Sequence, residues 1–385
     1  MRIVRIATIP FVVLHHLEGQ IRASIAAGHE VFVITMRGPE TERIRALGVA
    51  GVVCVDIARE ISPVADFIAL LGLWREFGRL KPDLIHSITP KAGLLAAIAG
   101  CLRGVPIRLH TFTGQAWAER KGLVRWLSRL ADRVIVRLNT RCYADSFSQR
   151  EFLVAEGICR QEEIRVLGSG SLAGVDLKRF DIGRLRGAAA ETRARLGIPA
   201  AHKVIVFVGR VTRDKGVGEL VAAFGGLRNA ALVLVGPPEA ERDPLAPETL
   251  AEIERNPAIH ATGYDPEPER YLAAADILCL PSYREGFGIV VLEAAALGVP
   301  CIGTRIVGLT DAVVDGVTGV LVPPKDAGAL GSALMELLTG DACRRALGEA
   351  ARDRVRREFD AEAMNADLLA EYARLESVRL GNNER

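Results

Sequence analysis

The sequence lacks most of the features that mark a specialised class of protein. Only seven of its 385 residues are cysteine, an odd number without a CxxC pair, so the pattern indicates neither a disulfide scaffold nor a redox motif. Aromatic residues make up 5%, and the longest apolar stretch, Ala92 to Leu102, has about half of the ~20 residues that cross a bilayer. We expect a reduced cytoplasmic protein that spans no membrane and whose thiols are packing residues.

Charge of either sign is also not in large excess. The formal net charge is +2, with 49 basic and 47 acidic residues, so the global balance does not predict a nucleic-acid partner. The chain begins directly with the strand-like run Arg2 to Ala7, which leaves no room for the charged and apolar regions of a signal peptide. A length of 385 residues exceeds what one core usually supports, so we expect two domains.

Short apolar runs alternate with helical patterns along most of the chain, which predicts α/β domains with parallel sheets covered by helices on both faces. A polar, arginine-rich stretch from about Val175 to Ala201 interrupts the alternation. We therefore expect domains at 1–175 and 176–360, and a terminal helix at 361–385 that returns toward the first domain. The expected strands are Ile3–Ala7, Glu30–Thr35, Val52–Val55, Asp83–His86, Ile107–His110, Arg141–Asp145, Ile164–Leu167, Lys203–Val208, Ala231–Val235, Ile259–Thr262, Ile277–Leu280 and Pro300–Gly303.

Two glutamates follow a predicted strand near residue 280. Glu285 lies on a glycine-containing loop, and Glu293 lies about two turns into the following helical pattern, among apolar or small residues. Each acid alone is equally compatible with a first-turn or surface residue of an amphipathic helix. Together, at the edge where open α/β sheets bind ligands, they favour a site for a compound rich in hydroxyl groups.

A second loop carries three cations at the end of another predicted strand. The run Gly209 to Gly216 contains Arg210, Arg213 and Lys215 and precedes a helical pattern. A solvated basic turn is an alternative interpretation of this loop by itself. Beside the two glutamates, binding of a diphosphate is favoured.

These segments resemble the retaining, nucleotide-sugar-dependent glycosyltransferases of family 4. The resemblance covers the C-terminal half and rests on Gly209-Arg210, Lys215-Gly216, Pro281-Ser282, Glu285-Gly286-Phe287-Gly288 and Glu293-Ala294. It implies the GT-B fold, two Rossmann-like domains facing across a cleft. It also implies that Arg210 and Lys215 bind the diphosphate, Glu293 the ribose and Glu285 the donor sugar, with donor-binding backbone at Gly209, Gly286, Phe287 and Gly288.

The first domain matches the family less closely. His110, at the end of a predicted strand, resembles the family's cleft histidine that reaches the donor sugar, although such a histidine is more often structural. Many members have a glycine pair after the first strand. Here no glycine pair occurs, and Gly19 is the one glycine nearby and the candidate donor-binding residue of this segment. His15 and His16 occupy the loop after that strand. This departure puts the N-terminal phosphate contacts in doubt.

Residues 118–141 form a basic amphipathic stretch. Seven arginine and lysine residues stand against two acidic ones and are interleaved with leucine, valine and Trp126. One interpretation is docking on an anionic membrane surface. The alternative is an ordinary helix that packs its apolar face on the sheet.

The resemblance implies a retaining glycosyltransferase that uses a nucleoside-diphosphate sugar, a UDP-sugar by expectation, and a glycan or polyprenyl-diphosphate-linked acceptor. Without an Asp-x-Asp string or a metal-ligand cluster, we expect metal-independent transfer and no cofactor. Peripheral attachment to the inner face of the cytoplasmic membrane is a further expectation. The alternatives are a UDP-sugar epimerase on the same architecture and a non-catalytic nucleotide-sugar-binding subunit.

Overall fold

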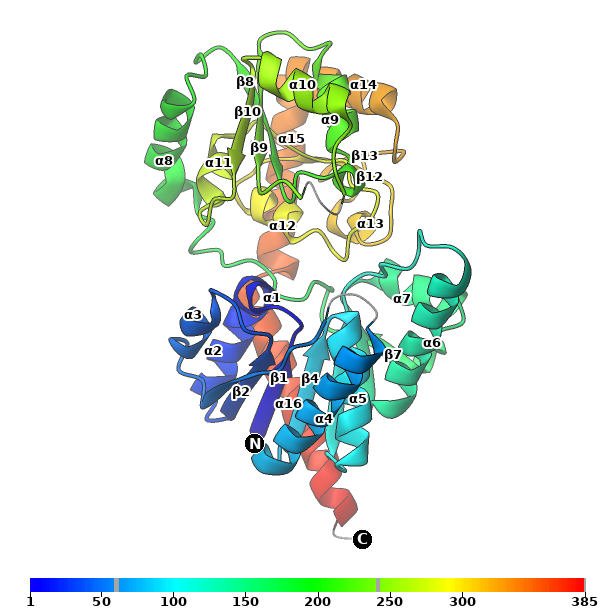
Figure 1. Cartoon of the computed structure of the whole chain (residues 1–385). Helices are drawn as coiled ribbons and strands as arrows, with labels where there is room; N and C mark the ends of the chain where they lie inside the picture. Colours follow the sequence, from blue (N-terminus) through cyan, green and yellow to red (C-terminus); the bar gives the residue numbers. More distant parts are fainter. Residues whose placement is uncertain (59–61, 240–242, 384–385) are drawn as a thin grey trace. The chain divides into compact units, whose positions relative to one another are not determined.

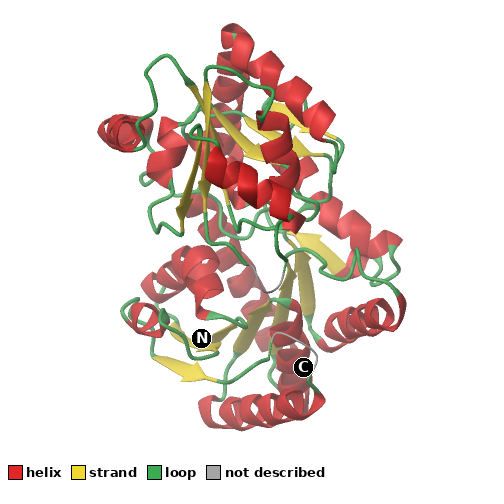
Figure 2. Cartoon of the chain, turned by 45° about the horizontal axis from the view of Figure 1, so that its top comes forward, coloured by secondary structure: helices red, strands yellow, loops and turns green. Residues whose placement is uncertain are grey.

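The chain divides into two compact units, Met1–Ala173 with Ala361–Arg385, and Gly174–Asp360 (Figure 1). The structure is a computed structural model, and it describes residues 1–58, 62–239 and 243–383. Figure 2 shows that yellow strands lie inside each unit and red helices lie outside them. This is the α/β architecture with two parallel sheets that the alternating pattern predicted.

The first unit is built on a parallel sheet with the strand order β3-β2-β1-β4-β5-β6-β7. Its strands are rich in buried apolar residues, as expected where helices cover both faces of a sheet. The strands are β1 (Arg2–Ile6), β2 (Glu30–Thr35), β3 (Gly51–Cys54), β4 (Leu84–Ile88), β5 (Ile107–Phe112), β6 (Arg141–Ala144) and β7 (Ile164–Val166).

The helices of the first unit divide between the two faces of its sheet. The crossovers that contain α4, α5, α6 and α7 all advance toward β7, so the right-handed rule places these helices on one face and α2 and α3 on the other. In Figure 1, α4 and α5 lie on the near side of the sheet and α16 lies on the far side, where it packs on α2. The helices are α1 (Pro10–Val12), the π-helix η1 (Val13–Leu17), α2 (Glu18–Ala26), α3 (Thr41–Arg45), α4 (Pro63–Leu80), α5 (Pro90–Leu102), α6 (Gly122–Leu138), α7 (Phe147–Ala155), the 3-10 helix η2 (Gln161–Glu163) and α16 (Ala361–Asn383).

The second unit has a parallel sheet with the strand order β10-β9-β8-β11-β12-β13. Its strands are β8 (Lys203–Val208), β9 (Ala230–Val235), β10 (Ile259–Gly263), β11 (Ile277–Leu280), β12 (Cys301–Thr304) and β13 (Gly319–Val322). Its helices are α8 (Ile182–Arg195), the 3-10 helix η3 (Arg213–Lys215), α9 (Val217–Phe224), α10 (Pro247–Arg255), α11 (Glu269–Ala274), α12 (Ile289–Ala296), α13 (Leu309–Ala312), α14 (Ala327–Thr339) and α15 (Asp341–Glu358).

The twelve runs expected to be strands coincide with β1 to β12 within a few residues, but the sequence pattern missed β13. Two further differences concern segments expected to be irregular. His15 and His16 lie on the π-helix η1 instead of a loop, and the polar stretch near residue 190 contains α8. In the described part of the chain, no helix has the length and apolarity that a membrane span needs.

The thiols are only partly the packing groups that the sequence predicted. Cys142, Cys159, Cys279 and Cys301 are buried, and all seven are free. The prediction is wrong for Cys101 and Cys343, which are exposed on α5 and α15. Both lie on outward-facing positions of these helices, which a count of apolar neighbours in the sequence does not distinguish from inward ones.

Candidate functional site

Two loops of the second unit meet at the carboxyl edge of its sheet. One follows β8 and the other follows β11, and these strands are neighbours. Gly216 has φ +70° and approaches the second loop so closely that a Cβ would lie 2.0 Å from the carbonyl oxygen of Pro281. The backbone N–H of Tyr283 donates to the carbonyl oxygen of Asp214 over 2.9 Å. A residue with a side chain at position 216 would therefore force the loops apart.

The contact between the loops brings two predicted site residues together. Nζ of Lys215 lies 2.6 Å from Oε1 of Glu285, although the residues are 70 positions apart. The hydroxyl of Ser282 donates to the same carboxylate oxygen over 2.7 Å. Both charged side chains are mostly buried, at 15% and 13% exposure. The two side chains are thus already ordered, so they lose less conformational entropy when a ligand binds.

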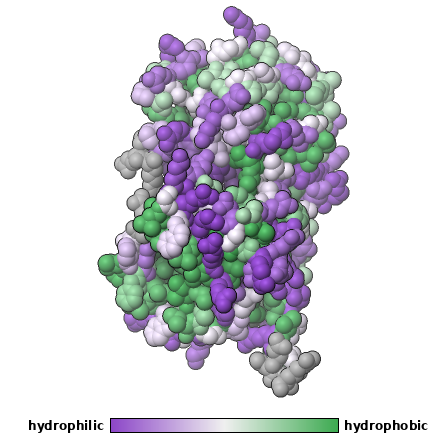
Figure 3. Space-filling model, turned by 90° about the vertical axis from the view of Figure 1, so that its right-hand side faces the viewer, coloured by the Kyte–Doolittle hydropathy of each residue, from purple (hydrophilic) through white to green (hydrophobic). Residues whose placement is uncertain are grey.

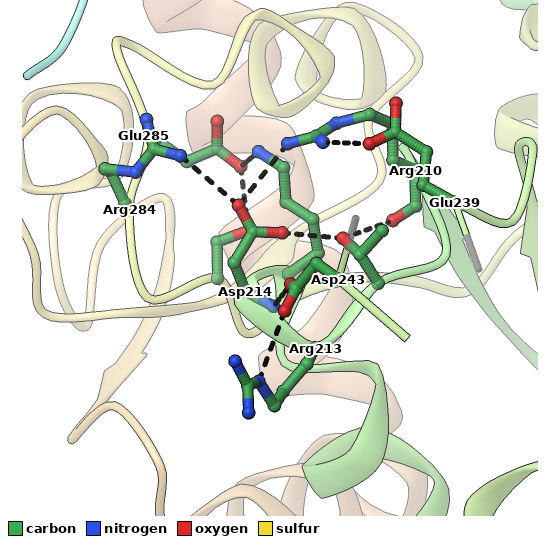
Figure 4. Close-up of polar contacts among 10 residues, drawn as sticks. Arg210, Arg213, Asp214, Glu239, Asp243, Arg284 and Glu285 are labelled. Carbon is green, nitrogen blue, oxygen red and sulfur yellow. Dashed lines mark hydrogen bonds and ion pairs between the residues drawn. The ribbon is translucent and has the colours of Figure 1, made fainter. Parts of the chain in front are cut away.

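Arg210 is paired with two carboxylates that the sequence analysis did not include (Figure 4). Its Nη1 donates to Oε2 of Glu239 over 2.7 Å, and its Nη2 lies 3.3 Å from Oδ2 of Asp214. Asp214 also contacts Nη2 of Arg284 at 3.4 Å and accepts from the hydroxyl of Thr212 over 2.6 Å. The arginine side chain is 39% exposed, so it stays within reach of solvent.

The surroundings of Asp214 keep it ionised. Burial by itself would raise the pKa of this carboxyl group, but the Thr212 hydroxyl and the cations Arg210, Lys215 and Arg284 together lower it below its ordinary value. Among the described residues of this network, the charges balance. Four cations stand against four carboxylates: Arg210, Arg213, Lys215 and Arg284, and Asp214, Glu239, Asp243 and Glu285. The three cations that the sequence analysis placed on the loop after β8 are therefore paired with carboxylates in an ion-pair network without net charge.

The missed carboxylates left only weak signals in the sequence. Asp214 stands four residues after Arg210 and could have been noticed as a local partner. Glu239 and Asp243 follow β9, and β9 neighbours β8 in the sheet, so only the strand order brings them to this loop. The order of strands in a parallel sheet is not encoded in any local pattern.

Glu293 lies on α12, apart from the ion-pair network. The helix begins after Gly288, which has φ +78° and whose Cβ would lie 2.7 Å from Cδ2 of Leu309. Burial raises the pKa of Glu293 to about 7, while nearby Arg179 opposes this shift and Glu269 adds to it. Arg179 forms its own ion pair with Glu269, with Nη2 and Oε2 2.8 Å apart. Among the described residues Glu293 has no hydrogen bond or ion pair, so its carboxyl group is available to a ligand hydroxyl.

The glycine-flanked segment between the two glutamates contributes mainly backbone. Phe287 is 3% exposed, and its ring packs against that of Phe359 at 5.4 Å between centroids. A Cβ on Gly308 would lie 1.9 Å from the carbonyl oxygen of Gly286, so two backbone segments touch there. The Phe287 side chain is thus a core group, and only its backbone is free to take part in binding. Gly209 follows β8 directly, and its N–H donates to the carbonyl oxygen of Val235.

His110 belongs to the first unit and is placed differently from the prediction. It lies inside β5, which continues to Phe112, and does not end the strand. Its side chain is 1% exposed, and Nδ1 is 3.0 Å from the hydroxyl of Ser87. A Cβ on Gly93 of α5 would come within 2.3 Å of the imidazole ring. Burial lowers the pKa of His110 to about 3, so the ring is neutral at physiological pH.

Gly19 and the two histidines before it lie at the start of α2 and on η1. A Cβ on Gly19 would meet the amide of Asn365 on α16 at 3.2 Å, so this glycine serves helix packing. His15 stacks on Phe11 with ring centroids 3.7 Å apart. Burial, followed by the charge of His15, lowers the pKa of His16 to about 4. His16 is therefore uncharged at neutral pH.

Residues 122–138 of the basic stretch form α6, and the apolar residues in the first half of this helix face outward. Leu123, Trp126, Leu127 and Leu130 are exposed, at 69%, 57%, 39% and 41%. The alternative in which α6 packs its apolar face on the sheet is therefore wrong for the first half of the helix.

Among the described residues, no group of three or more histidine, cysteine, aspartate or glutamate side chains is arranged to hold a metal ion.

The family models and the sequence relatives agree on one class, the glycosyltransferases. A family model described as "Glycosyl transferases group 1" matches residues 189–354, and one described as "Glycosyl transferase 4-like domain" matches residues 13–170. The capsular polysaccharide biosynthesis glycosyltransferase CapM of Staphylococcus aureus is 28% identical over 360 residues, which cover 92% of this chain and 93% of that protein. A D-inositol 3-phosphate glycosyltransferase of Corynebacterium diphtheriae is 35% identical over 217 residues, or 53% of this chain, and the match spans about half of that relative (48%).

Solved structures show the same fold at low sequence identity. The crystal structure of Anabaena HepE in complex with UDP and glucose has a TM-score of 0.82 and 18% identity, and the match covers 97% of this chain and 99% of that one. Sucrose-phosphate synthase from Thermosynechococcus elongatus has a TM-score of 0.77 and 22% identity, with 98% and 100% covered. At these identities the similarity concerns the fold alone.

Proposed function

Because the chain belongs to the glycosyl transferases of group 1 and is a GT-B glycosyltransferase, we propose that it moves a sugar from a UDP-sugar to a hydroxyl group of a glycan or polyprenyl-diphosphate-linked acceptor. The observation that carries this proposal is the meeting of Arg210, Lys215 and Glu285 at the carboxyl ends of β8 and β11. Cations for a diphosphate and a carboxylate for sugar hydroxyls then lie at one sheet edge.

The ion-pair network supports a binding mechanism by exchange. In this proposal the diphosphate of the donor takes over the hydrogen bonds that Arg210 gives to Glu239 and that Lys215 gives to Glu285. The carboxylate of Glu285 then turns to accept from hydroxyl groups of the donor sugar. Asp214 stays ionised and continues to hold Arg210 in place. The network thus keeps the cations positioned before the donor arrives.

Glu293 and His110 have separate roles in the proposal. The pKa of Glu293 is raised to about 7, so both protonation states are populated near neutral pH. The carboxylate accepts a hydrogen bond from a ribose hydroxyl, and the protonated carboxyl group donates one to it. His110 acts as a neutral hydrogen-bonding group for the donor sugar, because its pKa is lowered to about 3. Neither residue needs to carry a charge for these contacts.

We propose transfer with retention of the anomeric configuration and without a metal ion. The acceptor hydroxyl attacks from the side on which the diphosphate departs, and an oxygen of the leaving phosphate takes the acceptor proton. Arg210 and Lys215 stabilise the charge that develops on the diphosphate. Proton NMR of the first product formed tests the stereochemistry, and an inverted anomeric centre would exclude this route.

The acceptor and donor classes are supported by the similar proteins. CapM is named for capsular polysaccharide biosynthesis, and HepE was solved with UDP and glucose. The name of CapM agrees with a capsular polysaccharide as product, and the HepE complex agrees with a UDP-sugar as donor. We also propose that α6 brings the enzyme to the anionic inner face of the cytoplasmic membrane, where a polyprenyl-linked acceptor would be anchored.

The central test combines ligand binding with two substitutions. A thermal-shift panel of UDP-, GDP-, ADP- and TDP-sugars should show stabilisation by the UDP-sugar, since a ligand at a hundred times its Kd stabilises by ~2.7 kcal/mol. Arg210→Ala and Glu285→Ala should abolish most of the turnover in folded protein. Arg255→Ala is the matched control, because Arg255 lies on α10 of the same unit and its side chain is 82% exposed. Unimpaired turnover in both site variants would refute the proposal.

Incubation with the donor alone separates the transferase from an epimerase. A transferase should release sugar slowly by hydrolysis, whereas an epimerase should accumulate the epimeric nucleotide sugar. A non-catalytic subunit would do neither, although it would still be stabilised by the donor.

A further inference from the structure

The first unit exposes an unusual amount of apolar surface on three neighbouring helices. α5 packs against α4 and against α6, and all three helices cover the same face of the sheet. Eleven of the twenty exposed large hydrophobic residues in the described part of the chain lie on these helices, which have 18, 13 and 17 residues. Figure 3 shows a broad hydrophobic area, in green, on the lower part of the molecule, which is the first unit.

α4 is apolar on both of its faces. Ala69, Leu73, Phe77 and Leu80 are buried against the sheet and α5. On the opposite side, Val64, Phe67, Ile68, Leu71 and Trp74 follow at helical spacing and are exposed at 75%, 60%, 64%, 49% and 40%. A surface helix normally presents polar residues at such positions. Exposure of these apolar side chains to water is unfavourable, and contact of α4 with a second apolar surface would remove this unfavourable exposure.

α6 holds two of its charged residues, Arg125 and Asp132, in contacts with the protein and turns part of its apolar side outward. Arg125 forms an ion pair with Glu156, which comes directly after α7, at 2.9 Å. Asp132 accepts from the indole N–H of Trp117 over 2.6 Å and is 1% exposed. Trp126, on the other side, is 57% exposed. The intramolecular contacts of Arg125 and Asp132 therefore hold the side of α6 that carries Trp126 toward solvent.

The charge of this surface indicates which kind of partner it fits. The stretch 118–141 has seven basic and two acidic residues, an excess of +5 in a chain whose net charge is +2. On α4 two arginines balance two acids, but the guanidinium of Arg103 lies 3.4 Å from the ring centroid of exposed Trp74. A second copy of the chain would bring like charges together. An anionic bilayer fits both the apolar residues and the positive charge.

We propose that α4, α5 and α6 form one lipid-docking surface, in which α4 inserts apolar side chains and α6 supplies both apolar and electrostatic contacts. The lipid contact of α6 is part of the proposed function, and the inference extends it to a second, uncharged helix of the same face. α4 and α6 flank α5, so the two lines of apolar residues make contact with the bilayer on both sides of α5. Two such lines restrict the tilt of the first unit on the membrane more than one line does.

The test measures vesicle binding without donor or acceptor, so that a failure of the proposed transfer reaction does not affect it. Full-length protein is mixed with vesicles of phosphatidylcholine alone or of phosphatidylcholine with phosphatidylglycerol, and bound protein is separated by flotation. We expect binding to the anionic vesicles and much weaker binding to the neutral ones. Absence of binding to either kind would overturn the proposal.

Paired substitutions distinguish the two helices. Phe67→Ser with Ile68→Ser on α4 should lower binding roughly tenfold or more, by the same factor at low and at high salt, because no charge changes. Arg133→Gln with Arg137→Gln on α6 should lower binding mainly at low salt. The control is Leu250→Ser with Met335→Ser, whose side chains are 44% and 46% exposed in the second unit. Unchanged binding by the α4 variant would overturn the role of α4.

Tryptophan fluorescence gives a direct second readout. Brominated lipids should quench Trp74 and Trp126, so Trp74→Phe and Trp126→Phe should each reduce the quenched fraction, while Trp117 is 3% exposed and should be protected. Quenching that is unaffected by Trp74→Phe would show that α6 alone meets the lipid. The wild-type protein could instead be a dimer that binds no vesicles, while the α4 variant is a monomer. In that case the surface is an interface between two copies of the chain and the proposal is wrong.

Discussion

The hydroxyl of Tyr372 on α16 accepts a hydrogen bond from Nη1 of Arg5 on β1 over 2.8 Å. The same hydroxyl lies 2.7 Å from Nδ1 of His86 on β4. Arg5 and Tyr372 are 1% and 0% exposed, so this contact joins the last helix to the centre of the first sheet inside the core. The other terminal nitrogen of Arg5 donates to Oε1 of Gln20 over 2.7 Å. The buried guanidinium thus depends on neutral partners.

Tyr372→Phe should destabilise the first unit by about 1–3 kcal/mol, because Arg5 and His86 each lose a buried hydrogen-bond partner. Urea unfolding followed by circular dichroism measures the loss. Val378→Ala, at a position of α16 that is 52% exposed, should change stability much less. Equal effects of the two substitutions would contradict a structural role for the hydroxyl.

Glu239→Gln should tighten the binding of UDP. In the proposed exchange, Glu239 competes with the diphosphate for Nη1 of Arg210, and the amide competes less strongly because it carries no charge. The pair is partly exposed, so its worth is ~0.2–1 kcal/mol, which corresponds to an affinity gain of up to about fivefold. Isothermal titration calorimetry measures Kd, and Glu252→Gln on α10 serves as the control. Weaker binding of UDP by Glu239→Gln would show that Glu239 positions Arg210 instead of competing for it.

The difference in stability between Glu293→Gln and the wild type should change with pH in one direction. The carboxyl group has a pKa of about 7 in the folded protein and near 4.3 in an unfolded chain. The folded state therefore binds this proton more tightly, and ionisation removes stability as the pH rises between these values. Glutamine does not ionise, so the variant should gain on the wild type from pH 4 to pH 8, by up to roughly 3 kcal/mol. Parallel stability curves for the two proteins over this range would contradict the raised pKa.

Gly93→Ala should destabilise the protein, because the new methyl group would lie 2.3 Å from the His110 ring. Overpacking of this kind costs about 1–3 kcal/mol. In a His110→Ala background the same substitution should cost much less, since the ring that it meets is gone. A double-mutant cycle by thermal unfolding measures the coupling. Additive effects would mean that the backbone of α5, and not the ring of His110, limits the space.

Much of the fold was predictable from short patterns. Strands β1 to β12 are short apolar runs that alternate with helical patterns, and such runs are visible in any single sequence. β13 was missed because its four residues follow directly on the turn residues Asp315 to Thr318 at the edge of the sheet. The end of β5 was placed two residues too early, because Thr111 and Phe112 looked like the start of the following loop.

The candidate site was predictable in its parts and not in its contacts. The loops at Arg210 and Glu285 follow β8 and β11, and the sequence places each after a strand. That Lys215 contacts Glu285, and that Glu239 contacts Arg210, depends on the strand order β9-β8-β11. A local pattern carries no information on which strands are neighbours.

The sequence by itself determined the alternation of strands and helices, the family resemblance and the loops that carry the charged residues, because these depend on the order of residues along the chain. Only the tertiary structure decided that the cationic loop is neutralised by its own carboxylates, that His110 is buried and neutral, and that α6 turns its tryptophan outward. The physical reason is that pairing, burial and the orientation of an amphipathic helix are set by partners far away in the sequence.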